Sequence, residues 1–373
     1  MVTAAPAPPL PATATAEDRP GTRPRPSVRG LGPNWYATVM GTAIVATAGA
    51  GLPVRVPGLD GVCRVVWGLS ALLLGAVLAA RAAHWARHRD RALADLLDPA
   101  VAPFHGCLPM ALTAVGAATL SAGAEVIGVR AAVAVDAVLW PAGTLTALLT
   151  AAGIPALMVT RHRIGPGEAS PVWLLPVVAP MVSAAAGPAL VPHLPPGQGR
   201  SALLLGCAAL AGASLLATLL MLPLIFDRLV RHGPLPAAMT PAVLLVLGPL
   251  GQSTTAAGAM ADAAAYAGVP QTAARFASVV YGVPVMGFAL LWLATAGALV
   301  VGAARRGPFA MTWWGFTFPV GTCVTGATAL SRHTGLHALG WLAVGLYAAL
   351  VTAWALVAAR TALGLARGTL LAP

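Results

Sequence analysis

Long apolar stretches recur along this chain of 373 residues, and they constrain its fold more than any other feature. Each has about 17–25 residues or slightly more, the length that an α-helix needs to cross a bilayer. No stretch alternates polar and apolar residues as the strands of a membrane β-barrel do. The sequence therefore predicts an all-α integral membrane protein with ten spans, near residues 34–52, 64–84, 104–122, 131–159, 172–191, 202–226, 237–257, 275–302, 309–330 and 337–359.

The composition excludes a soluble enzyme. Hydrophobic residues make up 58% of the chain and charged residues only 9%, whereas a soluble domain is about 25% charged. The net charge of +11 comes from 22 basic residues, all of them arginine. In a soluble protein this excess would suggest a nucleic-acid partner. In a membrane protein it indicates charged loops on the cytoplasmic side, so we expect the lipid bilayer and no nucleic acid as partner.

The positions of the arginines predict the orientation. If the N-terminus is cytoplasmic, sixteen of the 22 arginines lie on the cytoplasmic side and six on the other side. Arginine and lysine concentrate in cytoplasmic loops. We therefore expect a multi-pass protein of the cell membrane with both termini in the cytoplasm. Residues 1–30, rich in proline and alanine, are predicted to form a disordered tail, 31–360 a ten-helix domain, and 361–373 a short C-terminal tail.

Internal prolines together with polar side chains occur in the third, fifth, seventh and ninth spans, although even-numbered spans also contain prolines (Pro141, Pro155, Pro223 and Pro284). Proline inside a membrane helix is tolerated where the freed backbone groups face protein or water. This tendency predicts an inner layer of odd-numbered spans around a central pore. The kinks and polar groups expected to line that pore are Pro109, Pro176, Pro180, Pro249, Gln252, Ser253, Thr254, Pro319 and Thr322.

Two segments deserve a functional hypothesis beside a packing one. In LGPLGQSTTAAGA (247–259), two glycines and a proline precede four polar side chains. A helix broken there would point the positive end of its dipole at an anion, and a hydrogen-bonded kink is the alternative. In the ninth span, Phe316 and Phe318 flank Thr317 just before Pro319. Spacing alone favours packing for these two rings, with a gate as the other possibility.

Few residues could carry other chemistry. Asp136 is the carboxylate placed most deeply in a span, and we expect it to be hydrated near the membrane edge. His84 and His88 lie four residues apart, on one helix face, so a metal or haem is conceivable. Four arginines surround them, which favours a cluster at the membrane surface. We expect no metal and no cofactor. A membrane-embedded redox enzyme that uses these two histidines is the alternative from another class.

Five ordered segments resemble the tellurite-resistance and dicarboxylate transporter family. The family includes TehA-type proteins, yeast malic acid permeases and the slow-type anion channels of plant guard cells. GPNWYATVMGTAIVATA, with Asn34, Trp35, Gly41 and Thr42, resembles its first-helix motif. The later motifs are similar to DPAVAPFHGCLPMAL (98–112), PVWLLPVVAPMVSAAAG (171–187), GPLGQSTTA (248–256) and WWGFTFPVG (313–321).

The resemblance covers residues 31–360 and implies five helical hairpins around a central pore, often in a homotrimer. It also implies a phenylalanine on the ninth helix that closes the pore. The matching residue is Phe318, and Phe316 is the alternative if the register shifts by two. We therefore expect no enzyme but a transporter of anions, with C4-dicarboxylates such as malate as the first expectation. Small inorganic anions such as chloride or nitrate, and tellurite resistance, are the alternatives.

Overall fold

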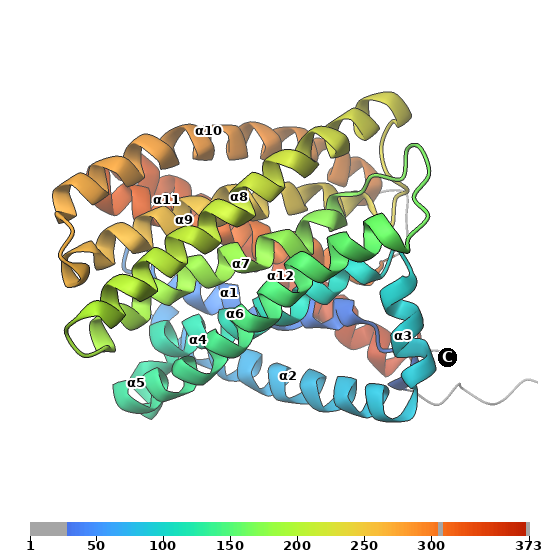
Figure 1. Ribbon diagram of the computed structural model, residues 1–373, viewed down its shortest axis with the longest axis horizontal. Helices are drawn as coiled ribbons and strands as arrows, with labels where there is room; N and C mark the ends of the chain where they lie inside the picture. The colour runs from blue at the N-terminus through green and yellow to red at the C-terminus, as the bar shows by residue number, and fades with distance from the viewer. Residues whose placement is uncertain (1–27, 305–308, 371–373) are drawn as a thin grey trace, which may run out of the picture.

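The computed structural model describes residues 28–304 and 309–370 of the chain. Most of its helices run along the longest axis of the molecule (Figure 1). The predicted N-terminal tail lies outside the described residues, apart from its last three positions. At the other end, the last helix continues past residue 360 to Ala366, so the predicted C-terminal tail begins inside a helix.

Five consecutive pairs of helices form hairpins: α1 with α2, α4 with α6, α7 with α8, α9 with α10, and α11 with α12. Eight helical segments in the described part are long and apolar enough to cross a membrane, and α1 and α11 complete the ten expected spans. The prediction of an all-α membrane protein is confirmed. The helix bounds are Tyr36–Ala50 (α1), Leu59–Arg87 (α2), Arg89–Leu97 (α3), Cys107–Ala118 (α4), Ala124–Ile127 (α5), Val129–Thr160 (α6), Leu174–Ala186 (α7), Gln198–His232 (α8), Leu247–Ala263 (α9), Gln271–Ala304 (α10), Thr317–Thr334 (α11) and His337–Ala366 (α12).

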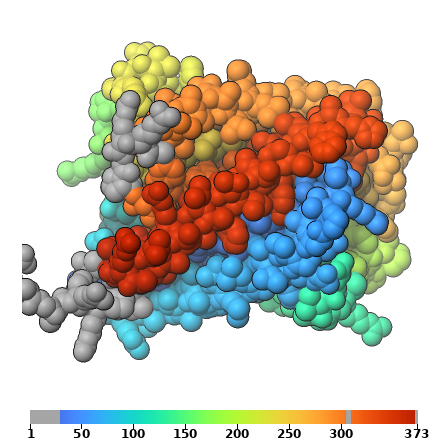
Figure 2. Space-filling model, turned by 180° about the vertical axis from the view of Figure 1, so that it is seen from behind, coloured from blue at the N-terminus to red at the C-terminus, as the bar shows by residue number. Residues whose placement is uncertain are grey.

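The first helix of each hairpin lies inside the molecule and the second lies outside. The inner helices contact one another in a closed ring, in the order α1, α4, α7, α9 and α11. The apolar part of the span that contains α7 is 94% buried, whereas α6 and α8 are 17% buried. Figure 2 shows three outer helices, α10, α12 and α2, that cover one side of the ring. The predicted alternation of inner and outer spans is therefore confirmed.

Each inner helix begins as a 3₁₀-helix and then changes to an α-helix. The 3₁₀ segments are Pro33–Trp35 (η2), Ala102–Gly106 (η3), Pro171–Trp173 (η5), Thr240–Val246 (η7) and Met311–Phe316 (η9). In four of the five, a proline is the third residue of the α-helix that follows: Pro109, Pro176, Pro249 and Pro319. Proline cannot donate to the carbonyl four residues earlier, and its ring clashes with that carbonyl. These prolines thus mark the change of winding at the start of each α-helix, rather than a kink in its middle.

Glycines let the inner helices approach until their backbones touch. A Cβ atom at Gly251 of α9 would lie 2.6 Å from the backbone nitrogen of Cys323 on α11. A Cβ atom at Gly321 of α11 would instead meet the Ile44 side chain of α1. Small residues at interfaces allow membrane helices to pack closely. The inner ring is therefore held by direct helix contacts, which leaves little free volume along its axis.

A buried charged network lies at the end of the molecule where the inner helices begin, called here the terminal end. Arg81 and His84 of α2 and Asp95 of α3 are each at most 5% exposed. The Arg81 guanidinium lies 3.9 Å from the Asp95 carboxylate and donates to the backbone oxygen of Leu31 at 2.5 Å. The predicted surface cluster is wrong for Arg81 and His84, because α3 folds back over α2 and buries them. The rings of His84 and His88 are 6.0 Å apart and tilted.

Candidate functional site: cavities along the central axis

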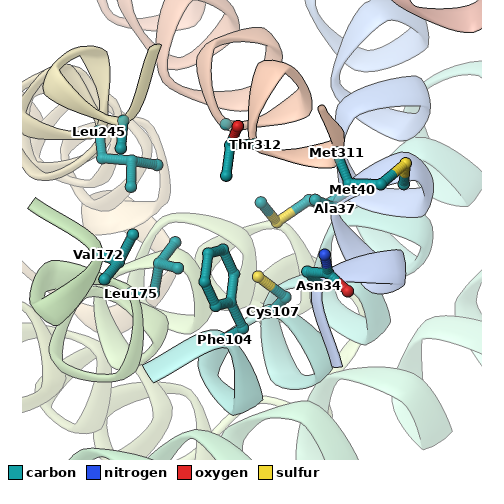
Figure 3. Close-up of a pocket in the computed structure, with 12 residues that line it drawn as sticks. Asn34, Ala37, Met40, Phe104, Cys107, Val172, Leu175, Leu245, Met311 and Thr312 are labelled. Atoms are coloured by element: carbon teal, nitrogen blue, oxygen red, sulfur yellow. The ribbon is translucent and has the colours of Figure 1, made fainter. Parts of the chain in front are cut away.

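Three cavities follow one another along the axis of the inner ring. They are called here the first, middle and far cavities, counted from the terminal end, and measure about 10, 20 and 70 Å³. A water molecule needs about 10–15 Å³ of such space, so the first two hold about one water each and the far cavity holds several. The side chains around the first cavity come from all five inner spans and converge on one space (Figure 3). They include Asn34, Met40, Phe104, Cys107, Val172, Leu175, Leu245, Met311 and Thr312.

The middle cavity is the apolar constriction of this path. Its lining contains no hydrogen-bonding side chain and consists of Met40, Met110, Leu174, Leu175, Val178, Leu245, Gly248, Phe318 and Pro319. The sequence had predicted prolines and polar side chains along the pore, with Phe318 as the ring that closes it. The structure differs, because methionine and leucine side chains form an apolar collar around that ring. Such a constriction excludes ions by dewetting, since no polar group replaces the water that an ion must shed.

Phe318 lies between the middle and far cavities. It lines both, and its side chain is buried. Phe316, the alternative residue, is not among the side chains that line the three cavities. Its ring packs edge-on against the Trp313 ring, with 6.2 Å between centroids. Of the two rings, Phe318 therefore has the position that the resemblance implies for a gate, and its gating role stays a prediction.

The far cavity is the polar part of the path. Five of its lining side chains can form hydrogen bonds: Thr47, Thr113, Gln252, Thr255 and Thr325. They come from α1, α4, α9 and α11, while α7 contributes Val182, Ala185 and Ala186. A hydrated or partly hydrated ion can therefore be accommodated on this side of Phe318 but not in the apolar collar.

Only some of the predicted pore-lining residues face the cavities. Gln252 and Pro319 do. Thr254 instead faces Gly282 of α10: a Cβ atom built at Gly282 would lie 3.0 Å from the methyl group of Thr254. Thr322 donates to the backbone oxygen of Pro319 at 2.7 Å and packs against Gly251 of α9. Ser253 donates to the backbone oxygen of Leu250 at 3.1 Å, and its side chain is buried.

Buried prolines, likewise, shape the helices rather than form the surface of the path. Pro109, Pro176, Pro180 and Pro249 are buried and are not among the side chains that line the three cavities. The sequence did not predict the apolar residues that do line the path, such as Met40 and Met110. These lie on helices that are apolar on every side, so no periodic pattern indicates which side faces the axis.

The first-helix motif joins α1 to its neighbours. Asn34 lines the first cavity at the terminal end. The backbone oxygen of Trp35 accepts a hydrogen bond from Thr38, and Gly41 packs against Thr317 and Trp314 of the ninth span. The Thr42 hydroxyl accepts a hydrogen bond from the Trp354 indole of α12 at 3.1 Å. Apart from Asn34, the motif residues hold α1 in place.

A larger hollow of about 240 Å³ opens at the terminal end and adjoins the first cavity. The two share Asn34, Phe104 and Met311. The hollow is also lined by Arg29, Arg91 and Asp95, and the Arg91 guanidinium lies 3.4 Å from the Asp95 carboxylate. A mouth lined with excess positive charge raises the local concentration of anions.

The path inside the inner ring is electrically neutral in its side chains. None of the residues that line the first, middle and far cavities is charged. Within the residues that the structure describes, no group of three histidine, cysteine or acidic side chains is placed to hold a metal ion. The arrangement can thus pass a small solute from a basic mouth through an apolar constriction into a polar cavity.

Asp136 departs from its predicted hydrated position. It is fully buried, and neither carboxylate oxygen has a hydrogen-bond partner among the described residues. The side chain fills the space left by Gly116 on α4. The expectation of a hydrated residue is wrong because the outer helix α6 turns this side chain inward, against α4.

Comparison with known proteins finds relatives over most of the chain. The sequence model of the voltage-dependent anion channel family (SLAC1) matches residues 30–362. An uncharacterised transporter of Methanocaldococcus jannaschii is 26% identical over 336 residues, which cover 90% of this chain and 93% of the relative. A sulfite efflux pump of Arthroderma otae is 26% identical over 341 residues, with 88% and 89% covered, and one of Trichophyton rubrum is 27% identical over 311 residues, with 81% and 82% covered.

Proposed function

This chain belongs to the voltage-dependent anion channel family, and we propose that it conducts small monovalent anions along the axis of its inner ring, with Phe318 as the gate. The observation that carries the proposal is the uncharged three-cavity path, lined by all five inner spans, in which Phe318 borders both the middle and the far cavity. A buried arginine would hold an anion tightly and slow its release. Conduction instead needs weak binding at several sites.

Small anions fit this path better than the C4-dicarboxylates that the sequence put first. A dianion needs two charges compensated, and no lining residue of the three cavities is cationic. The far cavity, at about 70 Å³, holds several waters at most. The relatives described as sulfite efflux pumps lead us to include sulfite, as its monovalent hydrogen form, among the anions proposed here.

The proposal places the terminal end in the cytoplasm. The basic mouth with Arg29 and Arg91 lies at that end, and cytoplasmic loops are enriched in arginine. The outer helices expose large apolar side chains, such as Leu72, Leu220 and Trp341, as lipid contact requires. We propose the cell membrane as the location, and the homotrimer implied by the resemblance as the assembly.

Flux into liposomes tests the proposal. Purified protein is reconstituted, and uptake of chloride, nitrate, hydrogensulfite and malate is measured against empty vesicles. We expect the three monovalent anions to enter and malate to enter more slowly. Faster entry of malate would restore the dicarboxylate hypothesis. If none of the four anions enters, in wild type or in Phe318→Ala, anion conduction through this axis is refuted.

A further inference from the structure

The hydroxyl groups of the far cavity point their protons away from the cavity. Thr47 and Thr113 each donate to a backbone oxygen four residues earlier on the same helix, at 3.2 and 3.0 Å. Of Thr255 and Thr325, one hydroxyl donates to the other and the other donates to a backbone oxygen of its own helix at 3.0 Å. The Thr255 and Thr325 hydroxyl oxygens also lie 2.7 Å apart. A hydroxyl has one proton and two lone pairs. The four threonines therefore present acceptors rather than donors to whatever occupies the cavity.

Gln252 brings an amide group to the lining of the far cavity, whereas the threonine protons already have partners in the protein. It is 5% exposed, and its Oε1 atom has no hydrogen-bond partner among the described residues. A buried polar atom without a partner is uncommon and calls for an explanation. The amide group offers two N–H donors, and its unpartnered oxygen is an acceptor that a ligand with an O–H group can satisfy. Ser183 is also buried on α7, but it is not among the cavity-lining residues.

This arrangement suits one kind of anion better than another. A halide or nitrate can only accept hydrogen bonds, so it obtains them from Gln252 and faces the lone pairs of the threonines. To serve it as a donor, each hydroxyl would first have to give up its bond to the helix backbone or to the neighbouring hydroxyl. An oxyanion that keeps one O–H group accepts from Gln252 and donates to a threonine oxygen.

We propose that the far cavity is a selectivity site for monovalent oxyanions that carry a proton, such as bicarbonate or hydrogensulfite, with Gln252 as donor and the threonines as acceptors. The inference rests on the proposed function, since the anion must first reach this cavity. It assigns Gln252 to binding of every anion, and Thr47 and Thr325 to the distinction between protonated and unprotonated ones.

Bicarbonate and nitrate are the matched probes. Both are planar, monovalent and built of three oxygens around one atom, and only bicarbonate carries an O–H group. Reversal potentials are recorded in planar bilayers at mildly alkaline pH, where bicarbonate is the main species. Wild type and Phe318→Ala are both recorded, so that a closed gate does not hide the selectivity. We expect bicarbonate to be more permeant than nitrate.

Three substitutions separate the roles. Thr325→Val removes an acceptor and should lower the bicarbonate-to-nitrate permeability ratio about fivefold to tenfold, the value of one hydrogen bond. Thr47→Val, on another helix, should act in the same direction and covers the case in which Thr325→Val fails to fold. Gln252→Met should reduce the conductance of both anions with little change in their ratio.

Thr328→Val is the matched control. Thr328 is buried on the same helix as Thr325, its hydroxyl has no described partner, and it is not among the residues that line the far cavity. Its ratio should equal that of wild type. The selectivity site is overturned if the bicarbonate-to-nitrate permeability ratio is below one and is the same in Thr325→Val, Thr47→Val and Thr328→Val. That result would leave anion conduction intact. The absence of current for either anion in both wild type and Phe318→Ala overturns the proposed function as well.

Discussion

Removal of the Phe318 ring should open the path without unfolding the protein. The ring is 3% exposed, yet it borders the middle cavity of about 20 Å³ and the far cavity of about 70 Å³. A phenylalanine packed on all sides loses about 3–5 kcal/mol on replacement by alanine. Because Phe318 already faces empty space on two sides, we expect a loss of about 1–2 kcal/mol.

The same change should raise anion flux. Without the ring, the middle and far cavities join, and water extends to the collar formed by Met40 and Met110. Part of the collar remains, so we expect an increase of about tenfold in basal flux, a barrier lowered by about 1.4 kcal/mol. Phe318→Leu, which keeps a smaller apolar group, should increase flux less. Liposome flux and thermal unfolding in detergent are measured on the same preparations.

Phe316→Ala is the control for this prediction. The Phe316 ring packs edge-on against Trp313 and is not among the residues that line the path. Its removal should lower the unfolding temperature and leave flux unchanged. The reasoning is refuted if Phe318→Ala loses the stability expected of a core residue with no gain in flux. Phe316 would then be the next residue to test as a gate.

Three further substitutions, the first of them with a matched control, test the packing and the buried charges. Gly251→Ala should destabilise the protein by about 1–3 kcal/mol, because the new methyl group meets the backbone of α11. Gly287→Ala is the control and should not destabilise the protein, because the added atom meets nothing within 4 Å. Equal unfolding temperatures for the two variants would contradict the close contact at Gly251. Asp136→Asn should leave thermal stability unchanged. An ionised carboxylate buried without a partner would cost several kcal/mol, so we expect a neutral carboxyl group, and the neutral amide has the same shape. A large drop in the unfolding temperature would show that the charge is needed. Asp95→Ala should lower the free energy of unfolding in detergent by about 3 kcal/mol, since it removes the carboxylate that faces buried Arg81. A change below about 0.5 kcal/mol, which is typical of surface sites, would count against the network.

The ten spans and their two layers could be predicted from the sequence, because the bilayer sets the length and hydropathy of each span and limits where proline is tolerated. The side of each inner helix that faces the axis could not. On α9, Gln252 faces the far cavity and Thr254 faces α10, although they are two residues apart and equally polar. Helices buried on every side carry no periodic pattern, so their rotation is set by contacts such as Gly251 against α11.

The charged network at the terminal end could not be predicted for a related reason. Arg81 and His84 stand in a run of basic residues that reads as a surface cluster. Their burial depends on α3, which brings Asp95 back onto α2 from a position outside the membrane spans. The hydropathy of a span or of a short amphipathic helix does not indicate that the two will contact each other.

A native cysteine offers the most direct test of the central claim, that anions pass along the axis of the inner ring. All four cysteines are buried, and Cys107 lines the first cavity, whereas Cys63, Cys207 and Cys323 are not among the lining residues of the three cavities. An anionic thiol reagent is applied from the terminal side to Phe318→Ala channels in a bilayer. We expect the current to be blocked, and Cys107→Ser to remove the block. An unblocked current, or a block that persists in Cys107→Ser, would contradict conduction along this axis.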